Sequence, residues 1–347
     1  MGGPPAGIRR RPRLAHMTTR AAVIGAGSWG TTVASLLAPR VSTVLWSRRP
    51  DVVSDIAEGH GNQRYLAGFD LAGELEATAD IAEAVSGADV VVVGVPTHGF
   101  RETLAAAVPA IGANVPVVSL AKGFEQGTRL RMTQVAAELL PGHPVGVLSG
   151  PNLAKEILDG RAAATVVACS DAGVAETLQE LLASDRLRVY TNDDVVGCEV
   201  GGAVKNVIAL AAGMAEGLGT GDNARAALIT RGLAELTRLG EALGADPRTL
   251  AGLAVLGDVL VTCMRPQSRN RCFGEQVWRG RPPAEVFART DQVAEGVRTA
   301  GVVCELAAEA GIEMPIAEGV RAVIDGGRPP VEVWAALMAR RARPEID

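Results

Sequence analysis

At 347 residues the chain is too long for one ordinary hydrophobic core, so we expect two domains. Hydrophobic residues make up 48% of the composition and charged residues 21%, as is usual for a globular protein. The formal net charge of −5 argues against a nucleic-acid partner or an acidic membrane surface, and no uninterrupted apolar run reaches the roughly 18 residues of a membrane span.

Residues 1–19 are rich in proline, glycine and arginine, with an arginine cluster at positions 9, 10, 11 and 13. No apolar segment follows the arginines, as an export signal would require. Two interpretations stay open: a disordered basic tail, or coding sequence upstream of a true start at Met17. We expect the protein to be cytoplasmic.

The first half alternates short β-branched runs with amphipathic stretches, which indicates a mostly parallel sheet of the Rossmann type. The predicted strands are residues 20–25, 41–46, 89–94, 115–120, 145–149, 163–169 and 187–191. The predicted helices between them are residues 28–37, 103–108, 130–140 and 174–182.

After Asn192 the clustered valines give way to long stretches of helical periodicity. The predicted helices are residues 195–216, 224–243, 269–278, 295–310 and 316–324. We therefore expect a dinucleotide-binding domain at 20–194 and an all-helical substrate and catalytic domain at 195–341.

The segment Gly25-Ala26-Gly27-Ser28-Trp29-Gly30 follows the first predicted strand and opens the first predicted helix. In this context GxGxxG is typical of dinucleotide binding: Gly25 permits a tight turn, Gly27 lets the backbone approach a pyrophosphate, and Gly30 allows close helix–strand packing. The phosphates would lie at the positive N-terminus of the helix.

The tip of the second strand favours NADP over NAD. An NAD site usually places Asp or Glu there, whereas this chain has Ser47, Arg48 and Arg49, and guanidinium groups suit a 2′-phosphate. The alternative is a solvated basic loop, with Asp51 close by.

The five cysteines are dispersed and the four histidines have no metal-ligand spacing, so neither a disulfide framework nor a metal site is expected. Lysine is more informative, because it occurs only at Lys122, Lys155 and Lys205 among 34 basic residues. Lysine can lose a proton where arginine cannot, so we expect Lys205 and Lys122 to be functional and Lys155 to be structural.

Three features of the second half suit hydride transfer to or from a hydroxyl group. Lys205, on a helix after two glycines, is a candidate proton acceptor. Asp258 could orient that lysine, bind a substrate hydroxyl or cap a helix. Ser268, Arg269 and Asn270 at a helix start would suit a phosphate dianion.

These segments together resemble the bacterial NAD(P)-dependent sn-glycerol-3-phosphate dehydrogenases over about residues 20–340. The segments that carry the resemblance are VIGAGSWGT (23–31), AKG (121–123), SGPNLAKE (149–156), GGAVKNVIA (201–209), GDNARAALITRGL (221–233), LGDVLVTC (256–263), QSRNR (267–271), QVAEG (292–296) and EMPI (313–316). One departure is Ala67, which stands where the family usually has proline after Asn62, Tyr65 and Leu66.

The resemblance implies an N-terminal Rossmann-like domain, a C-terminal helical domain of the 6-phosphogluconate-dehydrogenase type, and interconversion of dihydroxyacetone phosphate and sn-glycerol 3-phosphate for phospholipid synthesis. It implies Lys205 as the proton acceptor, and a substrate site of Lys122, Gly150, Asn152, Lys205, Asp258, Ser268, Arg269 and Asn270. It implies a cofactor site of Ser28, Trp29, Arg48, Lys122, Ala154, Arg269, Val293 and Glu295, in addition to Gly25, Gly27, Gly30 and Arg49 from the motifs.

Three alternatives compete with this interpretation: another β-hydroxyacid dehydrogenase, a UDP-sugar dehydrogenase with a cysteine nucleophile, and a non-catalytic NADPH sensor. The QSRNR segment disfavours the first, and Cys263 and Cys272 lack the context for the second. A sensor has no need of a proton carrier such as Lys205. The expected partner is a small-molecule substrate, and a homodimer stays open.

Overall fold

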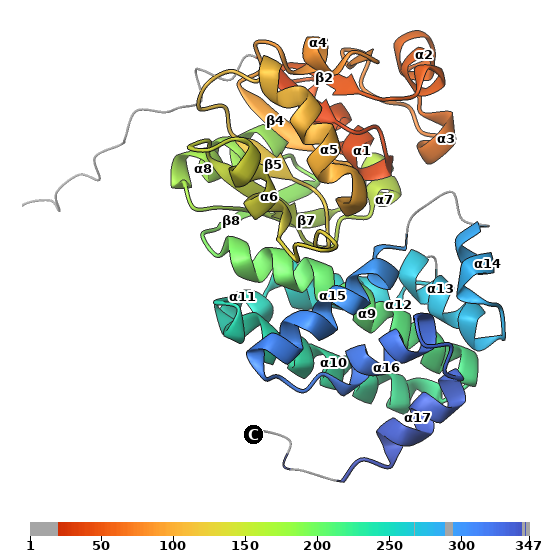
Figure 1. Cartoon of the computed structure of the whole chain (residues 1–347). Coiled ribbons are helices and arrows are strands. Elements are labelled where there is room, and N and C mark those ends of the chain that lie inside the picture. Colours follow the sequence, from red (N-terminus) through yellow and green to blue (C-terminus); the bar gives the residue numbers. More distant parts are fainter. Residues whose placement is uncertain (1–19, 267, 289–293, 342–343, 345–347) are drawn as a thin grey trace, which may run out of the picture.

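The computed structural model describes residues 20–266, 268–288, 294–341 and 344. Its N-terminal half is built on an eight-stranded sheet with helices on both faces, and its C-terminal half is helical (Figure 1). The strand order is β3-β2-β1-β4-β5-β6-β7-β8. The strands are β1 (Arg20–Ile24), β2 (Ser42–Trp46), β3 (Glu76–Thr78), β4 (Val90–Val93), β5 (Val117–Ser119), β6 (Val145–Ser149), β7 (Ala163–Cys169) and β8 (Leu187–Asn192).

The sheet departs from a uniform parallel series at one place. Strands β1 to β6 are parallel to their neighbours, but β7 pairs antiparallel with β6, and β8 is parallel to β7. Between β6 and β7 lies only α7 (Ala154–Leu158), a helix of five residues. A parallel return needs a crossover long enough to span the sheet, and this short helix does not provide one.

The two faces of the sheet carry separate cores, divided by the alternation of side chains along each strand. Ala21 and Val23 of β1 pack with residues of α1 (Ser28–Leu37), α7 and α8 (Ala172–Leu182). Ala22 and Ile24 pack on the opposite face with α4 (Ile81–Val85), α5 (Thr97–Ala107) and α6 (Met132–Leu139).

Several short elements of this half were not predicted from sequence. They are α2 (Pro50–Gly59), α3 (Gln63–Leu66), β3, α4, the 3₁₀ turn η2 (Val108–Ala110) and α7. The predicted helix at 103–108 starts too late, because α5 begins at Thr97, directly after Pro96. Gly99 and Thr97 are poor helix formers, and tertiary packing overrides their local preference here.

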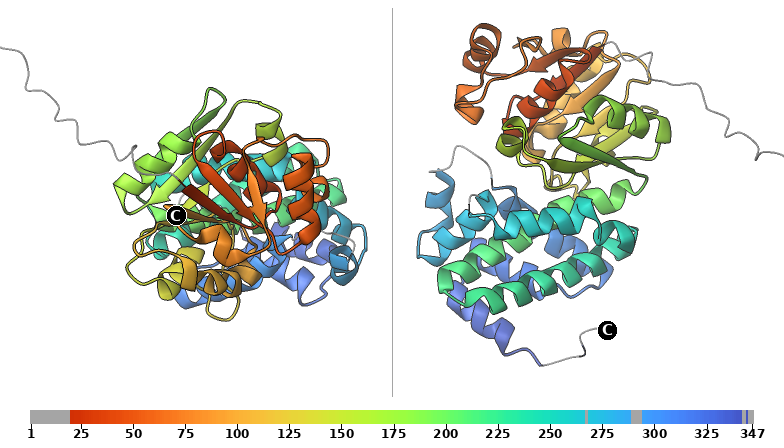
Figure 2. Two further views of the ribbon diagram at one scale, coloured as in Figure 1. Left: turned by 90° about the horizontal axis from the view of Figure 1, so that it is seen from above. Right: turned by 180° about the vertical axis from the view of Figure 1, so that it is seen from behind.

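In the C-terminal half the helices surround α9 (Val195–Leu218), which is buried along most of its length. Its surroundings are α10 (Gly221–Ala242), α11 (Pro247–Leu250), a π-helical turn η3 (Leu253–Gly257), α12 (Asp258–Met264), α13 (Arg269–Trp278), α14 (Pro283–Ala288), α15 (Glu295–Ala310), α16 (Pro315–Ile324) and α17 (Pro330–Met338). Helix α9 lies directly below the sheet in Figure 1 and in the right-hand view of Figure 2.

Helix α9 belongs to both halves of the molecule. Its apolar residues form one core with the other helices of the C-terminal half, and the same core includes Val147 of β6 and Val166 and Ala168 of β7. The two halves therefore share hydrophobic contacts, and α9 runs beneath the end of the sheet where β7 reverses direction.

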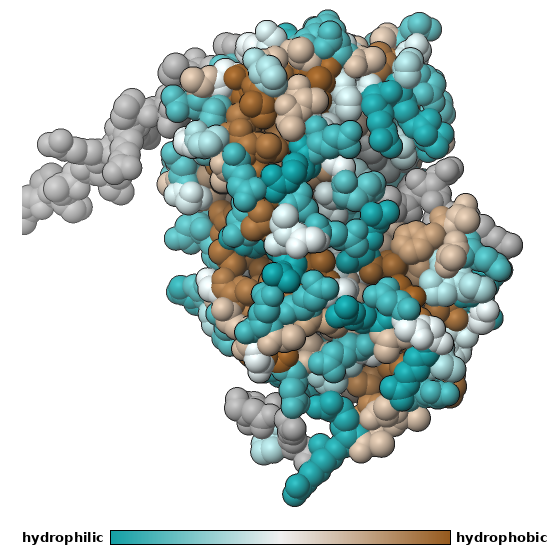
Figure 3. Space-filling model, in the orientation of Figure 1, coloured by the Kyte–Doolittle hydropathy of each residue, from teal (hydrophilic) through white to brown (hydrophobic). Residues whose placement is uncertain are grey.

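By length and composition, two helical segments of the described chain could span a membrane: Val195–Leu218 and Pro247–Met264. The most apolar window of the first is 89% buried inside the protein, as expected of a core helix, and that of the second is 39% buried. The face of the molecule drawn in Figure 3 is largely hydrophilic, with apolar residues in separate patches.

Candidate functional site

The residues predicted for the site follow the carboxyl ends of the parallel strands. Segments 25–30, 47–49, 121–123 and 150–152 come directly after β1, β2, β5 and β6. Because these strands are parallel, the segments lie along one edge of the sheet, where open α/β sheets bind ligands. Helices α9, α12, α13 and α15 of the C-terminal half bring the remaining predicted residues to the same edge.

The glycine loop has the geometry that dinucleotide binding requires. Gly25 has φ +111°, and a Cβ there would lie 2.9 Å from the backbone of Gly94. A Cβ on Gly30 would collide with the carbonyl oxygen of Gly25, whereas a Cβ on Gly27 would meet nothing within 4 Å. Helix α1 has no side-chain cap and no acidic residue in its first turn, which leaves its N-terminal N–H groups for a pyrophosphate.

Asn62, a residue not predicted for the site, fixes this loop. Its buried amide donates to the carbonyl of Ala26 at 3.0 Å and to Thr31 Oγ1 at 2.9 Å, while its Oδ1 accepts from the N–H of Tyr65. Ser28 Oγ donates to the carbonyl of Tyr65 at 3.2 Å. The loop is thus held by Asn62, the N-cap of α3, and by Tyr65 within that helix.

Beside the loop, Trp29 and Ala154 pack in the same apolar cluster. Trp29 Nε1 is buried and has no hydrogen-bond partner within the protein. Such an unpaired donor is costly, so it is expected to meet a ligand. Together with the open space at Gly27, this shows that the residues present fit a dinucleotide.

The predicted 2′-phosphate site lies at the end of β2. Arg48 is exposed, Arg49 precedes α2, and no acid among the described residues pairs with either guanidinium. One cationic group not found from sequence, Arg298 of α15, lies near: burial lowers the pKa of His98, and Arg298 and then Arg48 lower it further, so the imidazole itself is neutral at neutral pH. This part of the edge is therefore positive.

The centre of the site is a carboxylate shared by two lysines. Asp258 Oδ1 accepts from Lys205 Nζ at 2.7 Å, and Asp258 Oδ2 accepts from Lys122 Nζ at 2.6 Å. Lys205 Nζ also donates to Thr262 Oγ1 at 2.8 Å. Asp258 is the first residue of α12 and its carboxylate caps no helix, so the capping role left open from sequence is excluded, and the carboxylate is placed to orient the lysines.

Burial makes Lys205 a group that can exchange protons near neutral pH. Lys205 is 6% exposed and Asp258 is 2% exposed. Burial lowers the pKa of Lys205 to about 8; Asp258 opposes this shift and Lys122 adds to it. Burial acts to raise the pKa of Asp258, but the two ammonium groups outweigh it and hold that pKa below its usual value.

Lys122 also connects this centre to the loop after β6. Its Nζ donates to the carbonyl oxygen of Gly150 at 2.8 Å. In the same loop, both polar side-chain atoms of Asn152 are buried without a hydrogen-bond partner in the protein. Lys155, the second residue of the next helix, is exposed.

The predicted phosphate-binding segment begins α13. Ser268 caps this helix, and its Oγ accepts from the N–H of Arg271 at 3.4 Å. Arg269 is accessible to solvent, yet desolvation by the surrounding protein lowers its pKa against the influence of Glu295, a combination that suits the wall of a cleft. Asn270 is buried, and its side chain is engaged with the protein.

Asn270 is part of a chain of amides that sequence reasoning missed. Its Nδ2 donates to Asn206 Oδ1 at 2.9 Å, and its Oδ1 accepts from the N–H of Gly296 at 3.0 Å. Asn206 Nδ2 in turn donates to the backbone carbonyl of Lys122 at 3.0 Å. Asn206 directly follows Lys205 in the sequence, and Thr262 lies one helical turn after Asp258. Their closeness to a predicted site residue is the signal that could have identified both.

Glu295, predicted for the cofactor site, connects the helical half of the molecule to the sheet half. Its carboxylate accepts from the N–H of Thr97 at 3.3 Å and from the N–H of Lys122, and burial raises its pKa. Val293, also predicted for the cofactor site, lies outside the described residues, as does Gln267 of the QSRNR segment.

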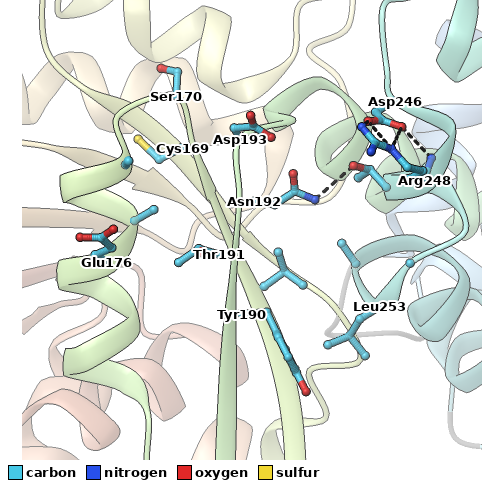
Figure 4. Close-up of a pocket in the computed structure, with 16 residues that line it drawn as sticks. Cys169, Ser170, Glu176, Tyr190, Thr191, Asn192, Asp193, Asp246, Arg248 and Leu253 are labelled. Carbon is cyan, nitrogen blue, oxygen red and sulfur yellow. Dashed lines mark hydrogen bonds and ion pairs between the residues drawn. The ribbon is translucent and has the colours of Figure 1, made fainter. Parts of the chain in front are cut away.

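Two other features lie apart from this chemistry. Burial raises the pKa of Cys263 to about 12, so its thiol stays protonated and is no nucleophile at neutral pH. A cavity of about 620 Å³ opens between β7, β8, α8 and the segment from Asp246 to Ala254, and the residues around it do not include those predicted for the site (Figure 4).

Comparison with known proteins gives a consistent result. Residues 20–175 match the NAD-dependent glycerol-3-phosphate dehydrogenase N-terminus, and residues 194–335 match the C-terminus of the same family. The chain is 54% identical to glycerol-3-phosphate dehydrogenase [NAD(P)+] of Thermobifida fusca, covering 94% of this chain and 98% of the relative. It is 51% identical to the enzyme of that name from Mycobacterium avium, covering 91% and 93%.

Solved structures agree. The crystal structure of glycerol-3-phosphate dehydrogenase from Coxiella burnetii superposes with a TM-score of 0.89 at 37% identity, covering 93% of this chain and 99% of that one. The two family domains match in order, the relatives are about half identical over nearly the whole length, and the solved structure is closely similar. The chain belongs to the NAD-dependent glycerol-3-phosphate dehydrogenase family.

Proposed function

We propose that this protein is a glycerol-3-phosphate dehydrogenase [NAD(P)+]. It reversibly transfers hydride between NAD(P)H and dihydroxyacetone phosphate, giving sn-glycerol 3-phosphate for phospholipid synthesis. The observation that carries the proposal is the buried Lys205, held by Asp258 beside Lys122 at the edge of the sheet where the glycine loop opens. When bound, the nicotinamide supplies or accepts the hydride.

Lys205 is proposed to move the proton that accompanies the hydride. In reduction its ammonium donates a proton to the oxygen of the ketone, and in oxidation its neutral amine accepts the proton of the hydroxyl. A pKa of about 8 keeps both forms accessible near neutral pH. Asp258 and Lys122 orient this group, and Lys122 is also proposed to contact substrate and cofactor.

The substrate phosphate is proposed to lie at the start of α13. Ser268, Arg269 and the positive N-terminus of helix α13 suit a dianion. The buried amide of Asn270 holds Asn206 and Gly296, so its proposed contribution is to shape the site and offer its backbone N–H. Gly150 and the unpaired amide of Asn152 line the opposite wall.

The cofactor is proposed to occupy the loop of Gly25, Gly27 and Gly30, with Ser28, Trp29, Ala154, Val293 and Glu295 around it. NADP is proposed as the preferred form. Arg48 and Arg49 have no acidic partner among the described residues, and the nearby Arg298 adds positive charge. A 2′-phosphate would neutralise this region.

Residues 20–194 are proposed as the dinucleotide-binding domain and residues 195–341 as the catalytic one. A cytoplasmic location is proposed because all five cysteines are free thiols, which suits a reducing compartment. A homodimer is proposed because Leu260 and Met264 of α12 expose 43% and 64% of their surface, and light scattering would test it.

The decisive assay follows NADPH oxidation with dihydroxyacetone phosphate, and compares it with NADP⁺ reduction by 6-phosphogluconate. We expect turnover with the first substrate and none with the second. Turnover with 6-phosphogluconate would indicate the rival β-hydroxyacid dehydrogenase. NADPH binding without turnover of either would indicate a sensor.

A further inference from the structure

The carboxylate that holds both lysines is preceded by an unusual helical turn. Residues Leu253–Gly257 form a π-helical turn, in which the N–H of Gly257 bonds to the carbonyl of Gly252 at 3.3 Å, and Asp258 follows immediately. A π turn contains about one residue more than an α turn, so it rotates the residue that follows by roughly 100° about the axis. The direction of Asp258 therefore depends on this turn.

The π-helical turn rests on a glycine of α9. A Cβ built on Gly201 would collide with the side chain of Val255 in the middle of the turn, with Val255 Cγ1 only 2.6 Å away. Val255 is fully buried, so it has no room to move aside. Gly201 lies one helical turn before Lys205 and therefore on the same face of α9, so the position of the turn is set relative to that lysine.

A small displacement of Asp258 would disturb its contacts with the two lysines. Its two oxygens are divided between two cations, with 2.7 Å to Lys205 Nζ and 2.6 Å to Lys122 Nζ. The lysines come from different halves of the molecule, α9 and the loop after β5. A shift of α12 away from α9 would lengthen one or both contacts.

We propose that Gly201 is a positioning residue for catalysis: its missing side chain lets Val255 and the π-helical turn lie against α9, which places Asp258 between Lys205 and Lys122. The inference rests on the proposed function of Lys205 and adds a structural cause for its orientation. The charged and titratable groups that act on Lys205 are Asp258 and Cys263 of α12, Lys122 of the loop after β5 and Glu295 of α15, and the influence of Asp258 is the largest, so a change at Asp258 should dominate the titration of Lys205.

The test is Gly201→Ala. We expect kcat for dihydroxyacetone phosphate reduction at pH 7 to fall about tenfold, with NADPH binding, measured by fluorescence, unchanged. Since Asp258 raises the pKa of Lys205, moving this carboxylate away should shift the alkaline limb of the pH profile to lower pH. The matched control is Gly301→Ala on α15, where a Cβ meets nothing within 4 Å and kcat should not change.

The double variant Gly201→Ala/Val255→Ala separates positioning from general destabilisation. Truncating Val255 removes the two closest colliding atoms and leaves only its Cβ, at 2.9 Å, so kcat should recover in large part although the melting temperature falls further through loss of a buried side chain. If Gly201→Ala acted only by destabilising the fold, the second substitution would lower kcat further instead of restoring it. Unchanged kcat and pH limb in Gly201→Ala, or no recovery in the double variant, would overturn the proposal.

A second readout needs no substrate. The chain has only three lysines, so lysine labelled with ¹³C at the ε carbon should give three signals, and the one missing in Lys205→Arg identifies Lys205. We expect its titration midpoint to move to lower pH in Gly201→Ala; an unmoved midpoint would refute the positioning role. Wild-type protein without activity on dihydroxyacetone phosphate would instead refute the proposed function.

Discussion

Two buried ionic clusters lie on the same helix, α9, and differ in the kind of cation they use. In the first, Glu199 accepts from Arg131 Nη1 at 2.7 Å and from the N–H of Thr133 at 2.9 Å, which joins α9 to the start of α6. In the second, Asp258 is shared by Lys205 of α9 and Lys122. Each cluster links the sheet half to the helical half, yet we expect only one of them to take part in chemistry.

The difference follows from the acid–base properties of the cations. An arginine is protonated at any accessible pH, so the cation of the Glu199 cluster does not release a proton, although burial raises the pKa of Glu199 itself. The ammonium of a buried lysine can lose its proton, and the pKa of Lys205 falls to about 8. Of the three lysines in a chain that otherwise uses arginine, Lys205 is the proposed proton carrier, a role that an arginine could not fill.

The largest expected effect is on turnover at Lys205. Lys205→Ala should lower kcat by at least about 100-fold with the fold intact, because no other group holds the proton at this place. Lys205→Arg is the sharper variant, since it keeps the charge beside Asp258 but cannot exchange the proton. Steady-state kinetics and circular dichroism check both, and near-normal turnover in either would remove Lys205 as the acid–base group.

At the other cluster the expected loss is in stability. Arg131→Met leaves the buried Glu199 without its cation, and we expect the free energy of unfolding to fall by about 2 kcal/mol. This is less than the roughly 3–5 kcal/mol of a fully buried pair, because the Arg131 side chain is 19% exposed. Urea denaturation measures it. A large loss of kcat in the folded variant, with stability unchanged, would reverse the contrast between the clusters.

The pH dependence of the reaction rate in both directions should follow the titration of Lys205 alone. Reduction needs the ammonium form, so kcat/KM for dihydroxyacetone phosphate should fall about tenfold per unit above pH about 8. Oxidation of sn-glycerol 3-phosphate needs the neutral amine, so its rate should rise to a plateau over the same range. The two profiles, measured in overlapping buffers, should cross. Parallel profiles would mean that a different group titrates.

The smallest expected effect concerns the cofactor. Arg48 is exposed, and a single exposed ion pair contributes at most about 1 kcal/mol. Arg48→Asp should therefore weaken NADPH binding about fivefold and leave NADH binding nearly unchanged, as measured by fluorescence titration. Equal losses for both cofactors would contradict the 2′-phosphate assignment.

Sequence patterns predicted what local chemistry determines. The glycine loop, the helix at residues 28–37 and the start of α9 follow from spacing and periodicity, and the scarcity of lysine singled out the two lysines that bond to Asp258. The sharing of Asp258 by Lys205 and Lys122 did not follow, because the contact between Lys122 and Asp258 joins residues 136 positions apart and leaves no periodic signal.

The missed elements have a similar cause. Strand β3 and helices α3 and α7 are only three to five residues long, too short to show a period. The reversal at β7 depends on the length of the connection rather than on the composition of the strand. The π-helical turn gives no pattern of its own, and its role emerges only once Val255 is seen against Gly201.

The core shared by α9 and the sheet also bears on how this protein could be recombined. A fragment ending at residue 194 would leave Val147, Val166 and Ala168 uncovered, and a fragment starting at residue 195 would lack the surface on which the first turns of α9 pack. The two halves are therefore not interchangeable modules. A chimera with a related dehydrogenase would have to carry the β6–β7 face and α9 together as one inherited unit.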